Sequence, residues 1–308
     1  MNSNYSRRQF LKRSTLAAGA LALAPEGVLR AQPAAQAAAK RTAVDEVTLG
    51  QTGVKLTRLG LGTGTRNGRV MTALGRDEFT KLVHYAYDQG IRHIDCSAGY
   101  ATFEWIAGAI KGLPREKLFI QSKLQGGPGD VLAGIDRQRK VYDTDYVDSM
   151  LVHCMVKAGW TGELKSVMDA LDQAREKKWI RAKGVSCHSV PALRASVASD
   201  WSEVHLVRVN PQGRRVDGME EVVSSPSDPV NDIAPVVAEI KKMGAKKRGV
   251  IGMKIFGEGT LATPEDREKS IRFAMSLPEI DAIVIGFKSA AEIDEAIKFV
   301  NSALAAPA

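Results

Sequence analysis

Short apolar segments alternate with longer amphipathic ones from about residue 46 to about residue 303. The apolar segments have the length of strands, and the longer ones repeat their apolar residues at the 3.6-residue period of a helix. The helix expected at about 162–178 shows this period, with one apolar face formed by Leu164, Val167, Met168, Leu171 and Ala174. Eight such strand-helix units predict one α/β domain at 46–304, a closed parallel barrel of the (β/α)8 or TIM type.

The expected strands lie at about 57–63, 91–96, 117–123, 146–153, 182–187, 204–210, 249–256 and 280–287, after a hairpin-like start at 47–56. The expected helices lie at about 77–89, 103–112, 129–141, 162–178, 190–198, 232–243, from 263 onward and 290–303. Thr263 is a typical N-cap residue and Pro264 suits the first helical position, so this helix has a clear start. The glycine-rich segment 60–65 is interpreted as a tight turn, because no helix opens directly after it.

Four polar side chains follow the ends of three successive expected strands. Asp95 ends the strand at 91–96, Lys123 ends the next strand, and His153 ends the one after. Tyr100 lies on the loop five residues beyond Asp95. Each residue alone also suits a structural role, but the carboxyl ends of barrel strands meet on one face, so together they predict a proton-transfer site. We expect Lys123 to lower the pKa of the Tyr100 phenol, and Asp95 to keep Lys123 charged.

This order and spacing resemble the aldo-keto reductase family, in which an Asp and a Tyr five residues apart follow strand two, a Lys ends strand three and a His ends strand four. The segments 48–63 (TLGQTGVKLTRLGLGT) and 180–186 (IRAKGVS) also resemble family signatures. The resemblance implies hydride transfer between a nicotinamide cofactor, NAD(P)H, and a carbonyl or alcohol substrate. It implies that Tyr100 is the proton donor, supported by Asp95, Lys123 and His153.

Two candidate cofactor contacts follow from the same resemblance. The family places a Ser-Asn pair after strand five, where this chain has Ser186 followed by Cys187 and His188. Only the serine can therefore be carried over. Asn210, at the end of the sixth expected strand, lies near the position of a family Gln that contacts the nicotinamide amide.

The start of the last helix bears on the choice between NAD and NADP. Lys288 and Ser289 precede this helix, whose N-terminal N–H groups favour anions, and both are candidate cofactor residues. Glu292 falls where NADP-preferring family members have an Arg that holds the 2′-phosphate. A carboxylate there would repel that phosphate, and Lys288 and Ser289 can replace part of the contact, so both cofactors stay open.

Two features concern access to the expected site. The loop at 211–230 is rich in Gly, Pro and Ser and lies on the catalytic face, where lids occur. Family members commonly have a longer C-terminal tail than the five residues that follow the last expected helix, so we expect an open site or one completed by this loop. Four basic residues near this face suit an anionic or polyhydroxylated ligand and equally a solvated surface: Arg208, Arg214, Arg215 and Lys254.

The first 39 residues differ from the rest of the chain. Paired Arg7-Arg8 ahead of Phe10-Leu11 is followed by an apolar run at 15–24 and a stretch rich in Ala, Gln and Pro. This pattern is typical of an export signal and resembles the twin-arginine type. The apolar run is short for a bilayer span, so we expect cleavage after Ala37 and no stable membrane anchoring. The twin-arginine export machinery is then a partner, and the location is periplasmic or otherwise exported.

Charge and cysteine content argue against other classes of protein. The formal net charge of +8 includes five basic residues and one acidic residue within 1–39, which leaves 38 basic and 34 acidic residues, a balance of +4. Basic clusters such as 246–248 have no interleaved aromatic residues, so nucleic-acid binding is not expected. The three cysteines, Cys96, Cys154 and Cys187, form no CxxC pair, so neither an iron-sulfur cluster nor a structural zinc site is expected.

The sequence therefore predicts an exported, nicotinamide-dependent oxidoreductase that acts on a small carbonyl or alcohol. Two other classes stay open. A non-catalytic barrel that binds a ligand or partner would suit the departures from the family at the cofactor positions. A Tyr/His acid-base lyase or isomerase without a free cofactor would use the same four residues.

Overall fold

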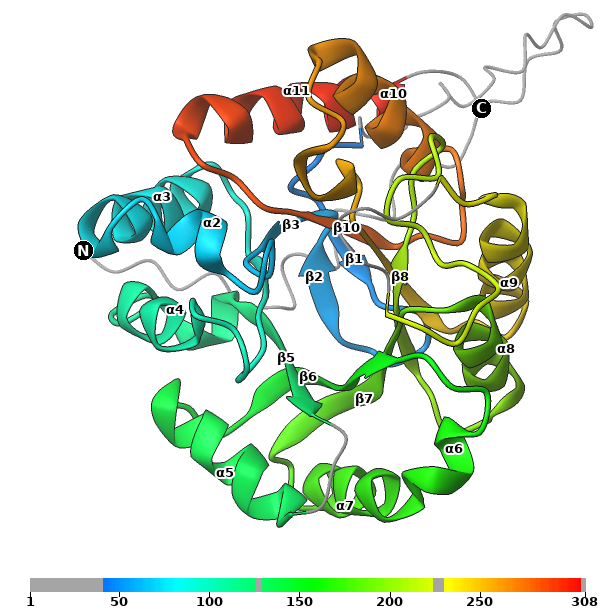
Figure 1. The fold of residues 1–308 in the computed structure, drawn as a ribbon. Helices are drawn as coiled ribbons and strands as arrows, with labels where there is room; N and C mark the ends of the chain where they lie inside the picture. Colours follow the sequence, from blue (N-terminus) through cyan, green and yellow to red (C-terminus); the bar gives the residue numbers. More distant parts are fainter. Residues whose placement is uncertain (1–40, 126–128, 224–229, 306–308) are drawn as a thin grey trace, which may run out of the picture. The chain divides into compact units, whose positions relative to one another are not determined.

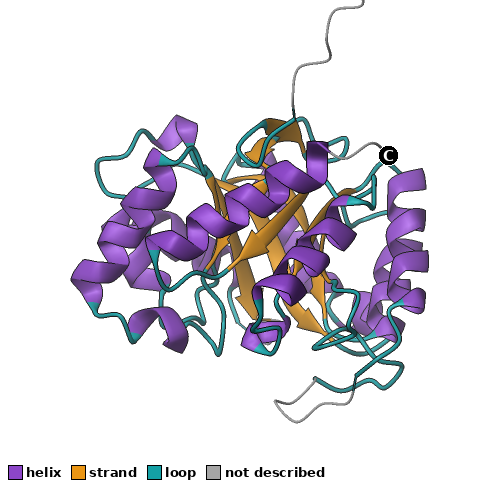
Figure 2. Cartoon of the chain, turned by 90° about the horizontal axis from the view of Figure 1, so that it is seen from above, coloured by secondary structure: helices purple, strands orange, loops and turns teal. Residues whose placement is uncertain are grey.

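The computed structural model describes residues 41–125, 129–223 and 230–305, so the expected signal at 1–39 lies outside the described residues. Eight parallel strands close into a barrel in the order β10-β3-β4-β5-β6-β7-β8-β9, which confirms the predicted (β/α)8 fold. Figure 1 shows the helices in a ring around the strands, and Figure 2 shows the strands enclosed by them. None of the helices in the described ranges is long and apolar enough to cross a membrane.

The strands are β1 (Glu46–Thr48), β2 (Lys55–Thr57), β3 (Leu59–Gly62), β4 (His93–Asp95), β5 (Phe119–Gln125), β6 (Val147–Met155), β7 (Ile180–Cys187), β8 (Val204–Arg208), β9 (Gly249–Met253) and β10 (Ala282–Ile285). The helices are α2 (Arg69–Thr72), α3 (Arg76–Asp88), α4 (Phe103–Ala109), α5 (Val131–Val141), α6 (Trp160–Glu163), α7 (Lys165–Glu176), α8 (Val190–Ala198), α9 (Ala234–Ala245), α10 (Pro264–Met275) and α11 (Ala290–Ala305). Short 3-10 turns lie at Arg115–Lys117 and Gly257–Gly259.

Apolar strands and capped helices account for this pattern. β10 reads Ala-Ile-Val-Ile and is buried throughout, as expected for a parallel strand that is covered on both faces. The Thr263 side chain accepts a hydrogen bond from the Asp266 N–H and so caps α10, which confirms the predicted start of this helix. Ser189 caps α8 in the same way through the Ala192 N–H.

Several elements differ from the prediction, and β5 and β6 continue two residues beyond Lys123 and His153, which were expected to end them. The helix expected at 162–178 is divided into α6 and α7, because Leu164 leaves the helical conformation with φ −109° and ψ 24°. The strand expected at 249–256 ends at Met253, since Lys254 adopts a left-handed φ of +57° that a strand cannot accommodate. The short helix α2, which buries Met71, is not indicated by the apolar pattern.

A hairpin closes the amino-terminal end of the barrel. Strands β1 and β2 pair in antiparallel fashion, which confirms the hairpin-like start. Leu49, Val54 and Leu56 pack against the apolar side chains that fill the barrel interior. The Gly50 N–H donates to the carboxylate of Asp281, directly before β10 begins, so the hairpin lies at the amino ends of the strands. The opposite face, at the carboxyl ends, is left for the site.

Buried imidazoles make the stability of the barrel sensitive to acid. His205 on β8 is 1% exposed, and burial lowers its pKa to about 3. Below about pH 6.5 the imidazole takes up a proton in the unfolded chain but stays neutral in the folded one, so falling pH favours unfolding. Between pH 6 and pH 4 we expect the free energy of unfolding to fall by about 1.4 kcal/mol per pH unit more in the wild type than in His205→Gln. Urea unfolding at several pH values measures this difference, and parallel profiles would contradict it.

Candidate active site

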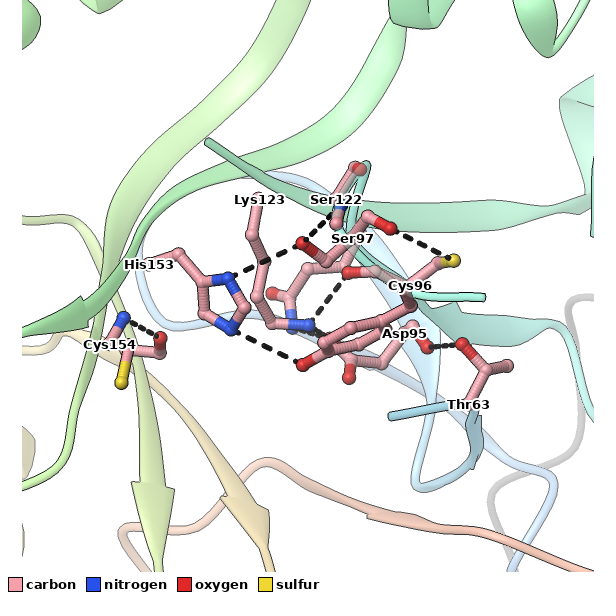
Figure 3. A network of polar contacts seen from close by, with 12 residues as sticks. Thr63, Asp95, Cys96, Ser97, Ser122, Lys123, His153 and Cys154 are labelled. Carbon is pink, nitrogen blue, oxygen red and sulfur yellow. Dashed lines mark hydrogen bonds and ion pairs between the residues drawn. The ribbon is translucent and has the colours of Figure 1, made fainter. Parts of the chain in front are cut away.

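The four predicted catalytic side chains lie together at the carboxyl ends of neighbouring strands. Figure 3 shows Lys123, from β5, pointing to Asp95 at the end of β4, with the His153 ring, from β6, on the other side of the Lys123 side chain. Tyr100 lies on the loop after β4, and its Oη is 3.3 Å from His153 Nε2. The parallel register brings these groups together, because β4 pairs with β5 and β5 pairs with β6.

A buried ion pair forms the base of the site. Lys123 Nζ lies 2.6 Å from Asp95 Oδ1 and donates a second hydrogen bond to the Cys96 carbonyl oxygen at 2.7 Å. The Lys123 and Asp95 side chains are 1% and 7% exposed. Burial acts most strongly and lowers the pKa of Lys123, but Asp95, Tyr100 and Cys96 together outweigh it, so the pKa is raised. The ammonium group therefore stays charged, as predicted.

The pKa of the Tyr100 phenol differs from the expectation. Burial raises this pKa to about 12, and the Lys123 ammonium, 5.0 Å from the ring centroid, opposes the rise without overcoming it. Lys123 acts to lower the pKa, as expected, but the pKa is raised overall because desolvation of a phenolate outweighs one nearby positive charge. The phenol keeps its proton at neutral pH, which is the state that a proton donor requires.

Gly64, on the loop after β3, fixes the position of the Tyr100 ring. A Cβ at this glycine would lie 2.6 Å from two carbon atoms of the ring, Cε2 and Cζ. We expect Gly64→Ala to displace the ring by about 1 Å and to lower the rate of the catalysed reaction by about 10²-fold, while the protein stays folded. Turnover and the thermal midpoint check this. Gly108→Ala is the matched control, because a Cβ there meets nothing within 4 Å, and equal activity of the two variants would contradict the prediction.

His153 has a partner at each ring nitrogen. Nε2 faces the Tyr100 hydroxyl, and Nδ1 lies 3.3 Å from the hydroxyl oxygen of Ser97. Burial, together with the charge of Lys123, lowers the pKa of His153 to about 3, so the imidazole is neutral. Ser97 is fully buried. Ser97 was not predicted as a site residue. Its position between Asp95 and Tyr100 is the feature of the sequence that could have indicated it.

An elongated pocket of about 360 Å³ opens beside Tyr100 and extends across the ends of β3, β9 and β10 toward α11. Several glycines line it, namely Gly62, Gly64, Gly259 and Gly286. A Cβ on Gly286 would lie 3.0 Å from both the Gly62 carbonyl oxygen and the Thr65 hydroxyl oxygen, so a larger residue would be tightly packed here. A pocket lined by glycines and by polar side chains leaves room for an extended polar ligand such as a dinucleotide.

Paired charges line the end of this pocket at α11. Arg267 on α10 donates two hydrogen bonds to Glu295, at 2.7 and 2.9 Å. Glu292, in the first turn of α11, accepts a hydrogen bond from the Lys288 N–H at 2.7 Å and lies 3.5 Å from Lys288 Nζ. Ser289 caps this turn by accepting from the Glu292 N–H at 3.3 Å. The basic side chains at this end of the pocket are therefore already paired with carboxylates of the chain, and a carboxylate also lies at the N-terminus of α11.

Two predicted cofactor residues bond to the backbone around the site. Ser186 Oγ accepts a hydrogen bond from the Cys154 N–H at 2.9 Å. The Asn210 amide donates to the carbonyl oxygens of Arg214 and Lys254, at 2.7 and 3.1 Å. Within the described part of the chain, the pocket is lined by Lys288 but by neither Ser186 nor Asn210. Contact of these two side chains with a cofactor stays a prediction.

Three of the four basic residues expected near the catalytic face form ion pairs, namely Arg208, Arg215 and Lys254. Arg208 is buried and pairs with Asp217. Lys254 pairs with Glu258, whose carboxylate also lies 3.3 Å from Arg215. Arg208 is therefore not a solvated surface residue, which was one of the two interpretations that the sequence allowed. Lys254 and Glu258 also line the elongated pocket, so their charges face any ligand bound there.

The three cysteines are free thiols. Cys96 and Cys187 are buried, and burial raises the pKa of both. Cys154 is half-buried, with its Sγ 3.2 Å from His188 Nδ1, and burial raises its pKa as well. Among the residues that the structure describes, no group of three or more His, Cys, Asp and Glu side chains is arranged to hold a metal ion.

The fold and the site together define a class of protein: a (β/α)8 barrel with a Tyr-His pair above a buried Lys-Asp pair, beside an elongated pocket. The model of the aldo/keto reductase family matches residues 58–267. Because this match spans most of the chain, the chain belongs to the aldo/keto reductase family, whose members are NAD(P)-dependent oxidoreductases.

Curated relatives match over part of their length. The chain is 32% identical over 140 residues to the 9,11-endoperoxide prostaglandin H2 reductase of Trypanosoma cruzi, which covers 43% of this chain and 45% of the relative. It is 36% identical over 123 residues to aldo-keto reductase family 1 member A1 of Xenopus tropicalis, covering 36% of this chain and 35% of the relative. The chain thus spans less than half the length of these relatives.

Solved structures match over nearly the whole barrel. An aldo-keto reductase from Bacillus halodurans has a TM-score of 0.65 at 14% identity, covering 86% of this chain and 92% of its own. An aldo-keto reductase from Klebsiella pneumoniae, solved in complex with NADPH, has a TM-score of 0.62 at 16% identity, covering 85% of this chain and 90% of its own. At these identities the likeness concerns the fold alone.

Proposed function

We propose that this chain is an exported carbonyl reductase that uses NAD(P)H, oxidises the corresponding alcohol in reverse, and has Tyr100 as its proton donor. The observation that carries the proposal is the cluster of Tyr100, His153, Lys123 and Asp95 beside the elongated pocket. Family membership supports the type of reaction. The protonated state of Tyr100 at neutral pH supports its role. The substrate class is a small carbonyl or alcohol.

Each residue of the cluster has a physical task in this reaction. When bound, the reduced nicotinamide supplies a hydride to the carbonyl carbon. Negative charge then develops on the carbonyl oxygen, and Tyr100 donates its proton there. The resulting phenolate is stabilised by the ammonium group of Lys123, which Asp95 keeps charged. His153 is neutral and holds the phenol by the contact of 3.3 Å at Nε2.

The pocket suits a dinucleotide that has no 2′-phosphate. Tyr100 marks where the nicotinamide must lie, so the adenosine half would extend toward α11, where Glu292 and Glu295 line the pocket. A carboxylate accepts hydrogen bonds from the hydroxyl groups of an unmodified ribose but repels a phosphate. We therefore expect NADH to bind more tightly than NADPH.

Removal of one carboxylate tests this preference. We expect the wild type to bind NADH on the order of tenfold more tightly than NADPH, since like charges a few ångströms apart repel by about 1–4 kcal/mol near a protein surface. Glu292→Gln should narrow this ratio, as measured by quenching of tryptophan fluorescence. Glu268→Gln is the control, because its carboxylate pairs with Arg272 on α10 outside the pocket lining. An unchanged NADH/NADPH ratio in Glu292→Gln would show that this carboxylate does not face the ribose.

Export is proposed from the sequence pattern at 1–39, with the twin-arginine machinery as the partner and the periplasm as the destination. Paired Arg7-Arg8 before an apolar run supports it. A barrel that binds its cofactor before export would suit a route that carries folded proteins. N-terminal sequencing of the exported protein should find a start directly after Ala37. Replacing both arginines by lysine should leave unprocessed protein inside the cell, and normal export of that variant would argue against this route.

Turnover tests the proposed function directly. Purified protein is mixed with NADH or NADPH and a panel of aldehydes and ketones, and oxidation of the cofactor is followed by absorbance. Cofactor binding together with carbonyl-dependent oxidation would support the proposal. A folded protein that binds neither cofactor would shift the balance to a ligand-binding barrel, or to a lyase or isomerase that works without one.

A further inference from the structure

Ser97 lies against the His153 ring from the loop after β4 (Figure 3). Its side chain is 0% exposed, so bulk water cannot serve as a hydrogen-bond partner. Among the described residues its hydroxyl oxygen has two partners, the Gly99 N–H at 3.3 Å and His153 Nδ1 at 3.3 Å. A backbone N–H can only donate. The buried hydroxyl proton therefore has one acceptor in this set, which is His153 Nδ1.

This arrangement assigns the proton of His153 to its other ring nitrogen. Burial keeps the pKa of His153 at about 3, so the ring is neutral and carries one proton. If Nδ1 accepts from Ser97, Nε2 carries that proton and donates to Tyr100 Oη, 3.3 Å away. In the opposite tautomer Tyr100 would donate to Nε2, and its proton would be directed away from a substrate.

We propose that Ser97 is a positioning residue that sets the tautomer of His153 and thereby leaves the Tyr100 proton free for the substrate. Hydrogen bonds run from Ser97 to His153 and from His153 to Tyr100, and Tyr100 donates to the alkoxide. The O–H bond of Tyr100 breaks as the O–H bond of the alcohol forms, while His153 and Ser97 keep their protons. The Nε2–H then also stabilises the phenolate, because a hydrogen bond to a charged acceptor is stronger than one to a neutral acceptor.

The tautomer can be measured by NMR on the purified protein without substrate. In protein labelled with ¹⁵N-histidine, a protonated ring nitrogen and an acceptor ring nitrogen have well separated chemical shifts. We expect a proton on Nε2 of His153 and none on Nδ1, with the signals assigned by their loss in His153→Asn. A proton on Nδ1 would overturn the proposal, whatever the substrate of the enzyme.

The role in turnover, which rests on the proposed function, is tested by three variants. Ser97→Ala removes the proton that Nδ1 accepts, so both tautomers become accessible. We expect kcat to fall about tenfold, as for the loss of one hydrogen bond, with KM for the carbonyl and Kd for NADH unchanged. Ser97→Thr keeps a hydroxyl group and should retain the wild-type tautomer and rate. Ser122→Ala is the matched control, because this buried hydroxyl donates to Gln138 at 2.5 Å and not to the tetrad of Asp95, Tyr100, Lys123 and His153.

The outcomes separate this inference from a structural role and from the proposed function. A slower Ser97→Ala whose tautomer is unchanged, or equal losses in Ser97→Ala and Ser122→Ala, would overturn it. If Ser97→Ala fails to fold, the inference is tested by the tautomer of His153 in the wild-type spectrum and by the rate of Ser97→Thr, which should equal that of the wild type. A wild type that has the expected tautomer but reduces no carbonyl would contradict the proposed function. The assignment of the hydrogen bonds would still hold.

Discussion

Tyr100→Phe is expected to lower kcat for carbonyl reduction by about 10²- to 10⁴-fold and to leave the affinity for NADH unchanged. The phenyl ring keeps its contact with Gly64 and its position near Lys123, so the substitution removes the proton donor alone. Steady-state kinetics and a fluorescence titration with NADH measure the two quantities.

A second tyrosine provides the control for this substitution. Tyr87→Phe removes a hydroxyl group on α3, where the guanidinium of Arg92 lies 3.7 Å from the ring centroid, and should leave kcat unchanged. If Tyr100→Phe kept activity within a few-fold of the wild type, another group would have to deliver the proton. Loss of NADH binding in Tyr100→Phe would show that the ring itself has moved.

Lys123→Met is expected to destabilise the fold by about 3–5 kcal/mol, because it leaves the buried carboxylate of Asp95 without its counterion. The pair is 2.6 Å apart, and both side chains are almost fully buried. Replacing both residues, in Asp95→Asn with Lys123→Met, should recover much of this loss, because no charge then remains buried. Unfolding in guanidinium chloride measures the free energy of unfolding of the wild type, of Lys123→Met and of the double variant.

An exposed ion pair is the natural comparison. Lys81 and Glu78 lie 2.8 Å apart on α3, but their side chains are 71% and 63% exposed. Lys81→Met should therefore change the free energy of unfolding far less than Lys123→Met does, because water and salt screen an exposed pair. A similarly small effect for Lys123→Met would mean that Asp95 takes up a proton or gains water once its partner is removed.

The barrel and the tetrad are predictable from sequence because both depend on short-range patterns. Each strand is a brief apolar run, and Asp95, Lys123 and His153 lie at or near the ends of three consecutive runs. Parallel pairing of neighbouring strands then brings their carboxyl ends to one face without further information. The loop to Tyr100 is short, so it keeps the phenol near Asp95.

Features that arise between distant segments are not predictable in this way. The raised pKa of Tyr100 depends on burial, including its close contact with Gly64, which lies on a different loop. The pairing of Arg267 with Glu295 joins two helices, and neither residue's neighbours in the sequence indicate it. The early end of β9 depends on the left-handed conformation of Lys254, which its residue type does not favour.

The barrel closes where its last strand, β10, pairs with its first, β3, and the pocket lies across this seam. Its lining runs from Gly62 and Thr65 on one side to Ile285 and Lys288 on the other. A ligand that binds only the closed barrel stabilises it by mass action. A dinucleotide bound there would therefore hold the first and last strands of the barrel together. Its release would favour local opening of the barrel between β3 and β10.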